Sequence, residues 1–268
     1  MPPLTWTTFI VSRLKISVVT VSFNSAATIE DTLFSVLAQK HAEFEHLVID
    51  GGSSDSTAEI VRQFKPEVNY FISEPDDGLY HAMNKGMTAA IGDIIGFLNS
   101  DDVYADSDVL QKVARVFADG NVDACYGDLV YVQQDDMSRV VRYWRSRPYS
   151  PGLVERGWMP AHPTFFVRRS ILQELGGFNT RYRYHADFDL MVRLFLRKKI
   201  RSAYIPEILV RMRAGGRTNQ SVHNIIRGNL ESLDSLRSHG VAVTPMFFVG
   251  KLLSRVPQYF RRPDSTNL

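Results

Sequence analysis

The sequence contains a single cysteine, no long hydrophobic run and almost no net charge. Cys125 is the only cysteine among 268 residues, which excludes a disulfide framework or a zinc site built on several cysteines within the chain and favours a reducing compartment. The net charge of +2, without a basic stripe interleaved with aromatics, does not support nucleic-acid binding. No window reaches the roughly 18–20 apolar residues that a membrane-spanning helix needs.

The N-terminal segment "MPPLTWTTFIVSRLKISVVTVSFN" has two apolar patches. It lacks a cationic region followed by a continuous apolar stretch and a small-residue cleavage site, so it does not read as a signal peptide. We therefore expect a cytoplasmic protein, and association with the inner face of the membrane stays open as an alternative.

Strand and helix patterns alternate through the first half of the chain. Continuous apolar runs predict buried strands at 15–23, 46–51, 69–73 and 93–99, and helical spacing predicts helices at 26–39, 56–64 and 79–90. Strands joined by such helices predict a parallel sheet. A further strand is expected at 121–132, a helix from Phe188 onward and an amphipathic helix at 225–239, while the region between 133 and 187 looks less regular.

Polar residues follow three of the predicted strands, at Ser22–Asn24, Asp50–Gly52 and Asn99–Asp102. Open α/β sheets bind ligands at the carboxyl ends of their strands, so these residues are candidates for a binding site. Neither a G-x-G-x-x-G nor a G-x-x-x-x-G-K-[ST] motif occurs at the first strand–helix turn. The adjacent carboxylates Asp101 and Asp102 repel each other, so they either sit in water as a turn or hold a cation.

A second acidic pair lies in "YRYHADFDLMVRLFLRKK". Asp187 and Asp189 are two residues apart and cannot share a helix face, so we expect only one of them to point into the cleft. Asp187 falls at the predicted helix start, where a helix N-cap is the structural alternative to a chemical role.

Four segments together resemble a known family. "VVTVSFNSAATIEDTLFSVLAQ", "EHLVIDGGSSDSTAEIV", "DDGLYHAMNKGMTAAIGDIIGFLNSDD" and "HADFDLMVRL" resemble the successive motifs of family 2 inverting glycosyltransferases of the bacterial polysaccharide-biosynthesis type, over about residues 15–220. The resemblance implies an α/β protein with the GT-A (Rossmann-like) fold, a mostly parallel central sheet flanked by helices, and a C-terminal helical tail. It divides the chain into a GT-A domain at 1–224 and a helical extension at 225–268.

The resemblance also implies the substrates. The donor would be a nucleotide-diphosphate sugar, with a UDP-sugar expected, and the acceptor a hydroxyl of a glycan or a lipid-linked oligosaccharide. Asp50 would accept from the imide N–H of the base, with the cap of its Gly-Gly-Ser-Ser turn as the structural alternative. The substrate-binding residues implied are Thr20, Ser22, Asp50, Lys85, Asn99, Ser100, Asp102, Trp158, His162 and Arg217.

The same resemblance implies a divalent metal, Mn²⁺ or Mg²⁺, held by Asp101 and His223. Asn99 stands where the family's D-x-D motif often has its first Asp, so it would bind a ribose hydroxyl instead. Carboxylate and phosphate oxygens are the ligands that such cations prefer. Asp187 would be the general base, although Ala186 replaces the acid that usually precedes it, and Arg213 or Arg217 would meet the diphosphate.

Two other classes of function remain open. A sugar nucleotidyltransferase would need a Gly-rich loop with a nearby Lys or Arg after the first strand, and "NSAATIED" has none. An inactive nucleotide-sugar-binding protein is not excluded by the sequence. The tail "MFFVGKLLSRVPQYFRR" has two interpretations, an interfacial helix on an anionic membrane or a terminal helix packed on the domain.

Overall fold

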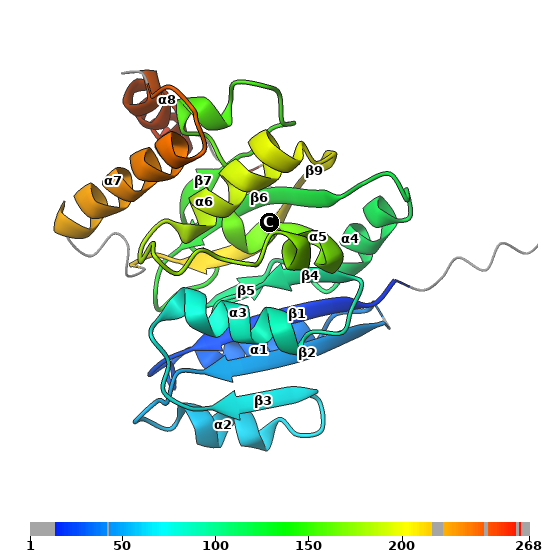
Figure 1. Ribbon diagram of the computed structural model, residues 1–268. Coiled ribbons are helices and arrows are strands. Elements are labelled where there is room, and N and C mark those ends of the chain that lie inside the picture. Colours follow the sequence, from blue (N-terminus) through cyan, green and yellow to red (C-terminus); the bar gives the residue numbers. More distant parts are fainter. Residues whose placement is uncertain (1–13, 42, 216–221, 244–245, 261–262, 264–268) are drawn as a thin grey trace, which may run out of the picture.

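The structure is a computed structural model that describes residues 14–41, 43–215, 222–243, 246–260 and 263 (Figure 1). Its described strands form a nine-stranded sheet in the order β3-β2-β1-β4-β8-β6-β9-β5, with β7 paired to β6. The first four strands are β1 (Ile16–Ser22), β2 (Phe44–Asp50), β3 (Tyr70–Ser73) and β4 (Ile94–Phe97). They pair in parallel, as the alternating pattern predicts.

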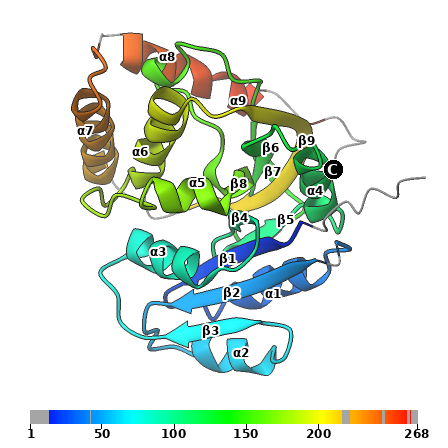
Figure 2. The same ribbon diagram turned by 45° about the vertical axis from the view of Figure 1, so that its right-hand side comes forward.

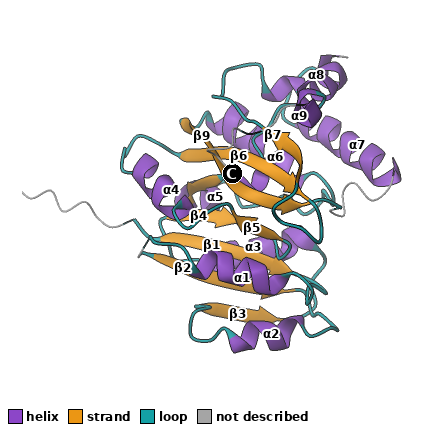
Figure 3. Cartoon of the chain, turned by 180° about the vertical axis from the view of Figure 1, so that it is seen from behind, coloured by secondary structure: helices purple, strands orange, loops and turns teal. Residues whose placement is uncertain are grey.

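Helices cover both faces of this parallel part. The intervening helices are α1 (Ile29–Leu37), α2 (Thr57–Gln63) and α3 (Leu79–Ala89). Figures 2 and 3 show α3 on one face and α1 and α2 on the other. Val19 and Val21 of β1 belong to the core cluster that includes α3, while Ile16 and Val18 belong to a separate cluster. The continuous apolar run of β1 follows from this burial on both faces.

The second half of the sheet is mixed in direction. Its strands are β5 (Asp102–Tyr104), β6 (Ala124–Val132), β7 (Val140–Trp144), β8 (Phe166–Arg168) and β9 (Ser202–Arg213). Strands β6 and β9 are parallel, whereas β8 pairs antiparallel with β4 and β6, β7 with β6, and β5 with β9. The strand predicted at 121–132 corresponds to β6, and the prediction missed β5, β7, β8 and β9.

Short helices connect these strands. They are α4 (Val109–Phe117), α5 (Arg169–Glu174), α6 (Ala186–Val192), the 3₁₀ turns η1 (Val154–Arg156) and η2 (His162–Thr164), and the π-helical turn η3 (Arg193–Lys198). The helix predicted from Phe188 onward is α6 continued by η3. The irregular region expected between 133 and 187 therefore contains two strands and three short helical elements.

Three C-terminal helices lie at the end of the molecule opposite β3 and α2 (Figures 1 and 3). They are α7 (Val222–Ser238), α8 (Met246–Arg255) and α9 (Pro257–Phe260). Leu236 of α7 and Phe247 of α8 are fully buried, and the Phe247 ring meets the Phe188 ring of α6 at 6.0 Å. The C-terminal helices therefore share the hydrophobic core of the sheet domain. Among the described helices, none combines the length and apolarity needed to cross a bilayer.

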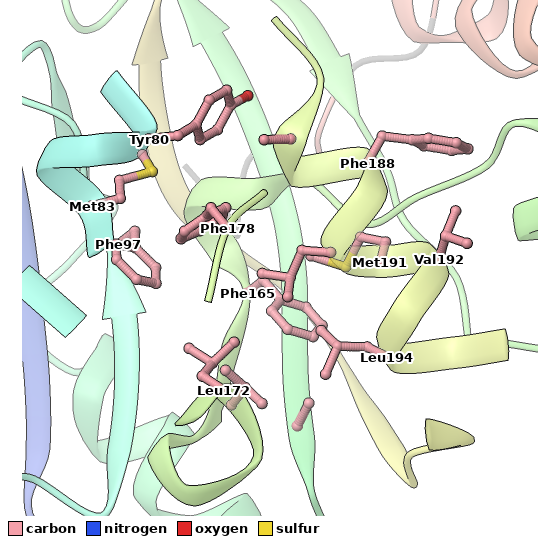
Figure 4. Close-up of a cluster of buried hydrophobic side chains, with 14 of the residues drawn as sticks. Tyr80, Met83, Phe97, Phe165, Leu172, Phe178, Phe188, Met191, Val192 and Leu194 are labelled. Atoms are coloured by element: carbon pink, nitrogen blue, oxygen red, sulfur yellow. The ribbon is translucent and has the colours of Figure 1, made fainter. Parts of the chain in front are cut away.

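Figure 4 shows the part of this core that lies between α3, β4 and α6. The rings of Tyr80 and Phe97 both pack against Phe178, at centroid distances of 5.5 and 5.1 Å. Phe188, Met191 and Leu194 continue the cluster on the side of α6 and η3. This contact fixes the start of α3 relative to the start of α6, which are 107 residues apart at Tyr80 and Asp187.

Gly86 lets α3 lie close to the sheet. A Cβ atom added at Gly86 would stand 2.3 Å from Cγ1 of Val19 and 3.2 Å from Cγ1 of Ile49. We predict that Gly86→Ala lowers the free energy of unfolding by about 1–2 kcal/mol, since overpacking outweighs the gain in helix propensity. Urea denaturation followed by circular dichroism measures it.

The matched control is Gly120→Ala, because a Cβ at Gly120 would meet nothing within 4 Å. Equal stability of the two variants would contradict the close packing of α3 on β1.

Candidate functional site

A cleft of about 1780 Å³ opens at the carboxyl ends of the parallel strands. It is lined by the residues that follow β1 and β4, by the starts of α3 and α6, by β7 and the segment after it, and by parts of α8 and α9. Single-ligand pockets are typically roughly 300–1,000 Å³. The cleft is therefore large enough for two substrates at once.

The two carboxylates after β4 have different surroundings. Asp101 lines the cleft together with Asn99 and Ser100, whereas Asp102 is fully buried in β5 opposite Met212 of β9. Burial, and secondarily the charge of Asp101, raises the pKa of Asp102 well above its ordinary value. Asp102 thus belongs to the sheet, and its backbone oxygen accepts a hydrogen bond from Thr32 Oγ1 at 2.8 Å.

Within the part of the chain that the structure describes, two side-chain oxygen atoms at this turn have no hydrogen-bond partner. Burial raises the pKa of Asp101, although the Arg213 guanidinium opposes the shift. Asn99 Oδ1 and Asp102 Oδ1 are buried without a hydrogen-bond partner among the described residues. Oxygen atoms in such a position fit a hard divalent cation.

The described residues do not supply a complete metal site. They contain no group of three or more His, Cys, Asp or Glu side chains that could hold an ion. His223 is exposed at the start of α7 and does not line the cleft, and Arg217 lies outside the described residues. A single carboxylate suits a cation such as Mg²⁺ that takes its other ligands from substrate phosphates and water.

Asp50 is a structural centre at the ends of three strands. Its carboxylate accepts hydrogen bonds from Ser22 Oγ (2.9 Å), from Ser53 N and Oγ (2.9 and 2.5 Å) and from Ser73 Oγ (2.7 Å). Burial acts to raise the pKa of Asp50, but these hydrogen bonds outweigh it and hold the pKa below its ordinary value. The side chain is fully buried, so the structure does not bring the Asp50 carboxylate to the cleft.

Two other predicted donor-binding residues also point elsewhere. Thr20 is fully buried, with Oγ1 2.9 Å from Nε2 of His46, whose pKa burial lowers to about 3. Lys85 Nζ forms an ion pair with Glu74 Oε1 at 2.8 Å. Neither residue lines the cleft, whereas Ser22 does.

Asp76 places a carboxylate beside Gly51 in the cleft. A Cβ atom on Gly51 would stand 3.0 Å from Asp76 Oδ2, and both residues line the cleft. Asp76 Oδ1 accepts a hydrogen bond from the backbone N–H of Gly78 at 2.8 Å. From the sequence, Asp76 and Asp77 are interpreted as caps of the following helix or as ribose contacts, and the fold places Asp76 next to the end of β2.

The structure separates Asp187 from Asp189. Asp187 lines the cleft one residue inside α6, whose N-cap is His185. Asp189 is fully buried, where it pairs with Arg193 Nε at 2.8 Å and accepts from Ser235 Oγ at 2.7 Å. Only Asp187 therefore faces the cleft, and Asp189 ties α6 to α7.

Asp187 is held through one of its oxygens. Oδ1 accepts from the Tyr80 hydroxyl at 3.2 Å and from the backbone N–H of Phe188 at 2.8 Å. Oδ2 makes no hydrogen bond with the residues that the structure describes. The Tyr80 hydroxyl also meets the carbonyl of Tyr184 at 3.0 Å, so it joins α3 to the loop before α6.

Glu231 of α7 fixes the same loop. Its carboxylate accepts from three consecutive backbone N–H groups, those of Arg183 (3.0 Å), Tyr184 (2.8 Å) and His185 (2.9 Å). Sequence reasoning missed both Tyr80 and Glu231, because the contacts span 107 residues for Tyr80 and about 46 for Glu231. Nothing in the local sequence marks either residue.

His162 and Trp158 both line the cleft but are packed differently. The His162 ring stacks on Phe97 at 5.7 Å, and neither ring nitrogen has a partner among the described residues. Burial lowers the pKa of His162, while the charge of Asp187 opposes the shift. Trp158 is only 8% exposed, within an aromatic cluster that includes Tyr126 and Phe195.

Acidic and basic residues are unevenly distributed around the cleft. The acidic residues of the lining are Asp76 and Asp77 before α3, Asp101 after β4 and Asp187 on α6. Arg183 lies before α6, and the other Arg and Lys residues of the lining lie on β7, after it, on η1 and on α8: Arg142, Arg145, Arg147, Arg156 and Lys251. Arg213 does not line the cleft, because its guanidinium donates to Asp31 Oδ2 (2.5 Å) and to the carbonyl of Asp101 (2.9 Å).

Comparison with known proteins shows which family has this sequence pattern. Residues 17–176 match the profile described as Glycosyl transferase family 2. An uncharacterized glycosyltransferase of Mycobacterium tuberculosis is 34% identical over 188 residues, which cover 68% of this chain and 69% of the relative. A PGL/p-HBAD biosynthesis glycosyltransferase of Mycobacterium bovis is 30% identical over 193 residues, which cover 70% and 73%.

Solved structures share the fold at lower identity. S. aureus TarS 1–349 matches with a TM-score of 0.65 at 17% identity, over 91% of this chain and 72% of that one. The mannosyltransferase PcManGT from Pyrobaculum calidifontis, in complex with GDP-Man and Mn²⁺, matches with a TM-score of 0.60 at 20% identity, over 90% and 69%. The expected GT-A architecture is confirmed.

The Asp50 network predicts a pH-dependent loss of stability. Because the folded-state pKa of Asp50 is lowered, its contribution is present above the unfolded value of about 3.9 and is lost as the pH falls through the folded value. We predict that Asp50→Asn lowers the free energy of unfolding by about 1–3 kcal/mol at pH 7. The difference in the free energy of unfolding between Asp50→Asn and the wild type decreases below about pH 4.

Urea denaturation across this pH range measures the gap. Asp135→Asn serves as the control, since that side chain is exposed and makes no hydrogen bond or ion pair with the described residues. A pH-independent gap would contradict an ionised Asp50 at the strand ends.

Proposed function

The chain belongs to glycosyl transferase family 2, and we propose that it moves a sugar from a nucleotide-diphosphate donor to a hydroxyl of a glycan or lipid-linked acceptor with inversion at the anomeric carbon. The observation that carries the proposal is the convergence of Asp76, Asp101 and Asp187 in one cleft from three remote segments. The cleft also has room for a donor and an acceptor together.

The donor occupies the side of the cleft at the ends of β1, β2 and β4. TarS structures with UDP and with UDP-GlcNAc, and the PcManGT structure with GDP-Man, support a nucleotide sugar, of which we expect a UDP-sugar. Asp76 accepts a hydrogen bond from the N–H of the base, because Asp50 has no free oxygen to offer. Asn99 and Ser100 contact the ribose and the start of the diphosphate.

Asp101 is the residue that would hold a divalent cation. When bound, Mn²⁺ or Mg²⁺ neutralises the charge that develops on the leaving group. The partly buried Asp101 carboxylate would supply the oxygen atom on the protein side. The neutral His162 ring, which is kept uncharged by burial, donates an N–H to a phosphate oxygen.

Asp187 is the general base. Tyr80 and the Phe188 amide hold its Oδ1, which leaves Oδ2 to take the proton of the acceptor hydroxyl. The acceptor oxygen attacks the anomeric carbon as the carbon–oxygen bond to the diphosphate breaks, and the electron pair leaves with the nucleotide. One displacement inverts the configuration.

A double displacement would need a nucleophile on the enzyme. The chain's one cysteine, Cys125, is fully buried, and burial raises the pKa of its thiol far above the ordinary value. A carboxylate can also act as a glycosyl nucleophile. We assign Asp187 to proton abstraction because the motifs resemble those of inverting enzymes, for which one base is sufficient.

The first test replaces Asp187, the proposed general base. We predict that Asp187→Asn lowers the rate of sugar transfer by about 10²–10⁴-fold while leaving donor affinity within about threefold, because the amide cannot accept the proton. Nucleotide release from UDP- and GDP-sugars measures turnover, and calorimetry measures binding.

Glu174→Gln is the control, since this exposed side chain pairs with Lys198 away from the cleft. Full turnover by Asp187→Asn would refute the base assignment. Donor binding without turnover by the wild type, across the sugars tested, would favour an inactive nucleotide-sugar-binding protein.

The second test distinguishes the proposed nucleobase contact of Asp76 from the proposed metal contact of Asp101. We predict that Mn²⁺ strengthens UDP binding to the wild type and that excess EDTA reverses the gain. Asp101→Asn abolishes this Mn²⁺-dependent gain, whereas Asp76→Asn weakens binding about tenfold with and without Mn²⁺, since it removes one charge-assisted hydrogen bond. Titration calorimetry with UDP measures both variants. A full Mn²⁺ response from Asp101→Asn would refute its role.

A further inference from the structure

The outer side of α8 and α9 carries an unusual row of exposed apolar side chains. Its members are Phe248, Val249, Leu253, Val256 and Phe260, of which Leu253 is 64% and Phe260 81% exposed. Phe248, Val249 and Leu253 lie on α8, Phe260 lies on α9, and Val256 lies between the two helices. We call these five residues the apolar stripe. A terminal helix that only covered the core would present polar residues at these positions.

The opposite side of the same helices is packed on the domain. Phe247 is fully buried against Phe188, and at Gly250 the backbone comes so close to η1 that an added Cβ would stand 2.5 Å from the Arg156 carbonyl oxygen. Gln258 of α9 accepts a hydrogen bond from Arg142 Nε at 2.8 Å. The helices are therefore anchored, and the apolar stripe faces away from the core.

Basic residues are frequent in the part of the sequence that carries the stripe. Residues 235–263 include Arg237, Lys251, Arg255, Arg261 and Arg262 and no Asp or Glu. Arg145, Arg147 and Arg156 are exposed on the neighbouring cleft wall, and Arg147 and Arg156 form no ion pair with an acid among the described residues. Apolar side chains within a basic surface match an anionic lipid bilayer.

The position of the stripe beside the cleft agrees with this partner. Leu253 belongs both to the apolar stripe and to the lining of the cleft. Its neighbours Gly250 and Lys251 also line the cleft. We propose that α8 and α9 dock this face on an anionic phospholipid bilayer, with the basic side of the cleft opening at the lipid surface. An acceptor anchored in the bilayer would then reach Asp187 without leaving the membrane.

A second copy of the chain fits the surface less well. In a two-fold dimer the same patch meets itself, so that its basic residues would face one another and repel. A bilayer with anionic headgroups supplies the opposite charge together with an apolar phase.

Cosedimentation of the full chain with vesicles tests the proposal without donor or acceptor, so its outcome is independent of the proposed reaction. We expect binding to phosphatidylglycerol/phosphatidylcholine vesicles, weak binding to pure phosphatidylcholine, and a decrease with added salt. The variant Leu253→Glu/Phe260→Glu should lose at least about tenfold in vesicle affinity, because two charges would enter the interface.

The matched control is Phe34→Glu/Ile91→Glu, which changes two side chains that are 54% and 65% exposed elsewhere. It should bind vesicles like the wild type, and circular dichroism checks that both variants fold. Wild-type protein that stays in the supernatant with anionic vesicles at low salt overturns the proposal. So does a wild-type dimer in size-exclusion chromatography that the Leu253→Glu/Phe260→Glu variant converts to a monomer.

Discussion

The buried carboxylate of Asp50 ties together the strand ends on which the donor side of the cleft depends. Ser22 ends β1, Asp50 ends β2, Ser73 ends β3, and all three meet in one set of hydrogen bonds. A buried charge is costly unless donors satisfy it, and here four hydrogen bonds do so. The loops that follow these strands are thereby held at the same edge, where Gly51 meets Asp76.

The side of the cleft at Asp187 depends on a second set of contacts, which comes from α7 and from α3. Glu231 of α7 holds the backbone before α6, and Tyr80 of α3 holds the Asp187 carboxylate. The proposed base is thus oriented by one element that precedes it by 107 residues and by another that follows it. The helix α7 therefore supports the loop before the proposed base as well as the core.

Much of the donor side was predictable, because it is built from local patterns. The runs that form β1, β2 and β4 are apolar on both faces, and each ends in polar residues, so strand type, parallel pairing and the location of a site follow from a short window. The second half was not predictable in this way. β8 and β9 pair with strands far away in sequence, and β5 is only three residues long.

The candidate residues show the same division. The sequence marked Asp101 and Asp187 for chemistry, and both line the cleft. The resemblance also implied donor-binding roles for Asp50, Thr20 and Lys85. In the structure, Asp50 accepts a hydrogen bond from Ser22, and Thr20 contacts His46. Lys85 forms an ion pair with Glu74. A sequence motif indicates which strand ends lie at the binding edge of the sheet. It does not indicate which neighbouring side chains will form hydrogen bonds with a given carboxylate.

The sequence by itself determined the family, the parallel half of the sheet and the edge at which the acids gather, because hydrophobic periodicity and motif spacing are local properties. Only the tertiary structure decided which acid of each pair faces the cleft, and which remote side chains, Tyr80 and Glu231, contact Asp187 and the loop before it. It also showed that α8 and α9 keep an apolar stripe exposed beside the cleft. These outcomes depend on contacts between remote segments, where burial and competing hydrogen bonds are settled by the packing of the whole chain.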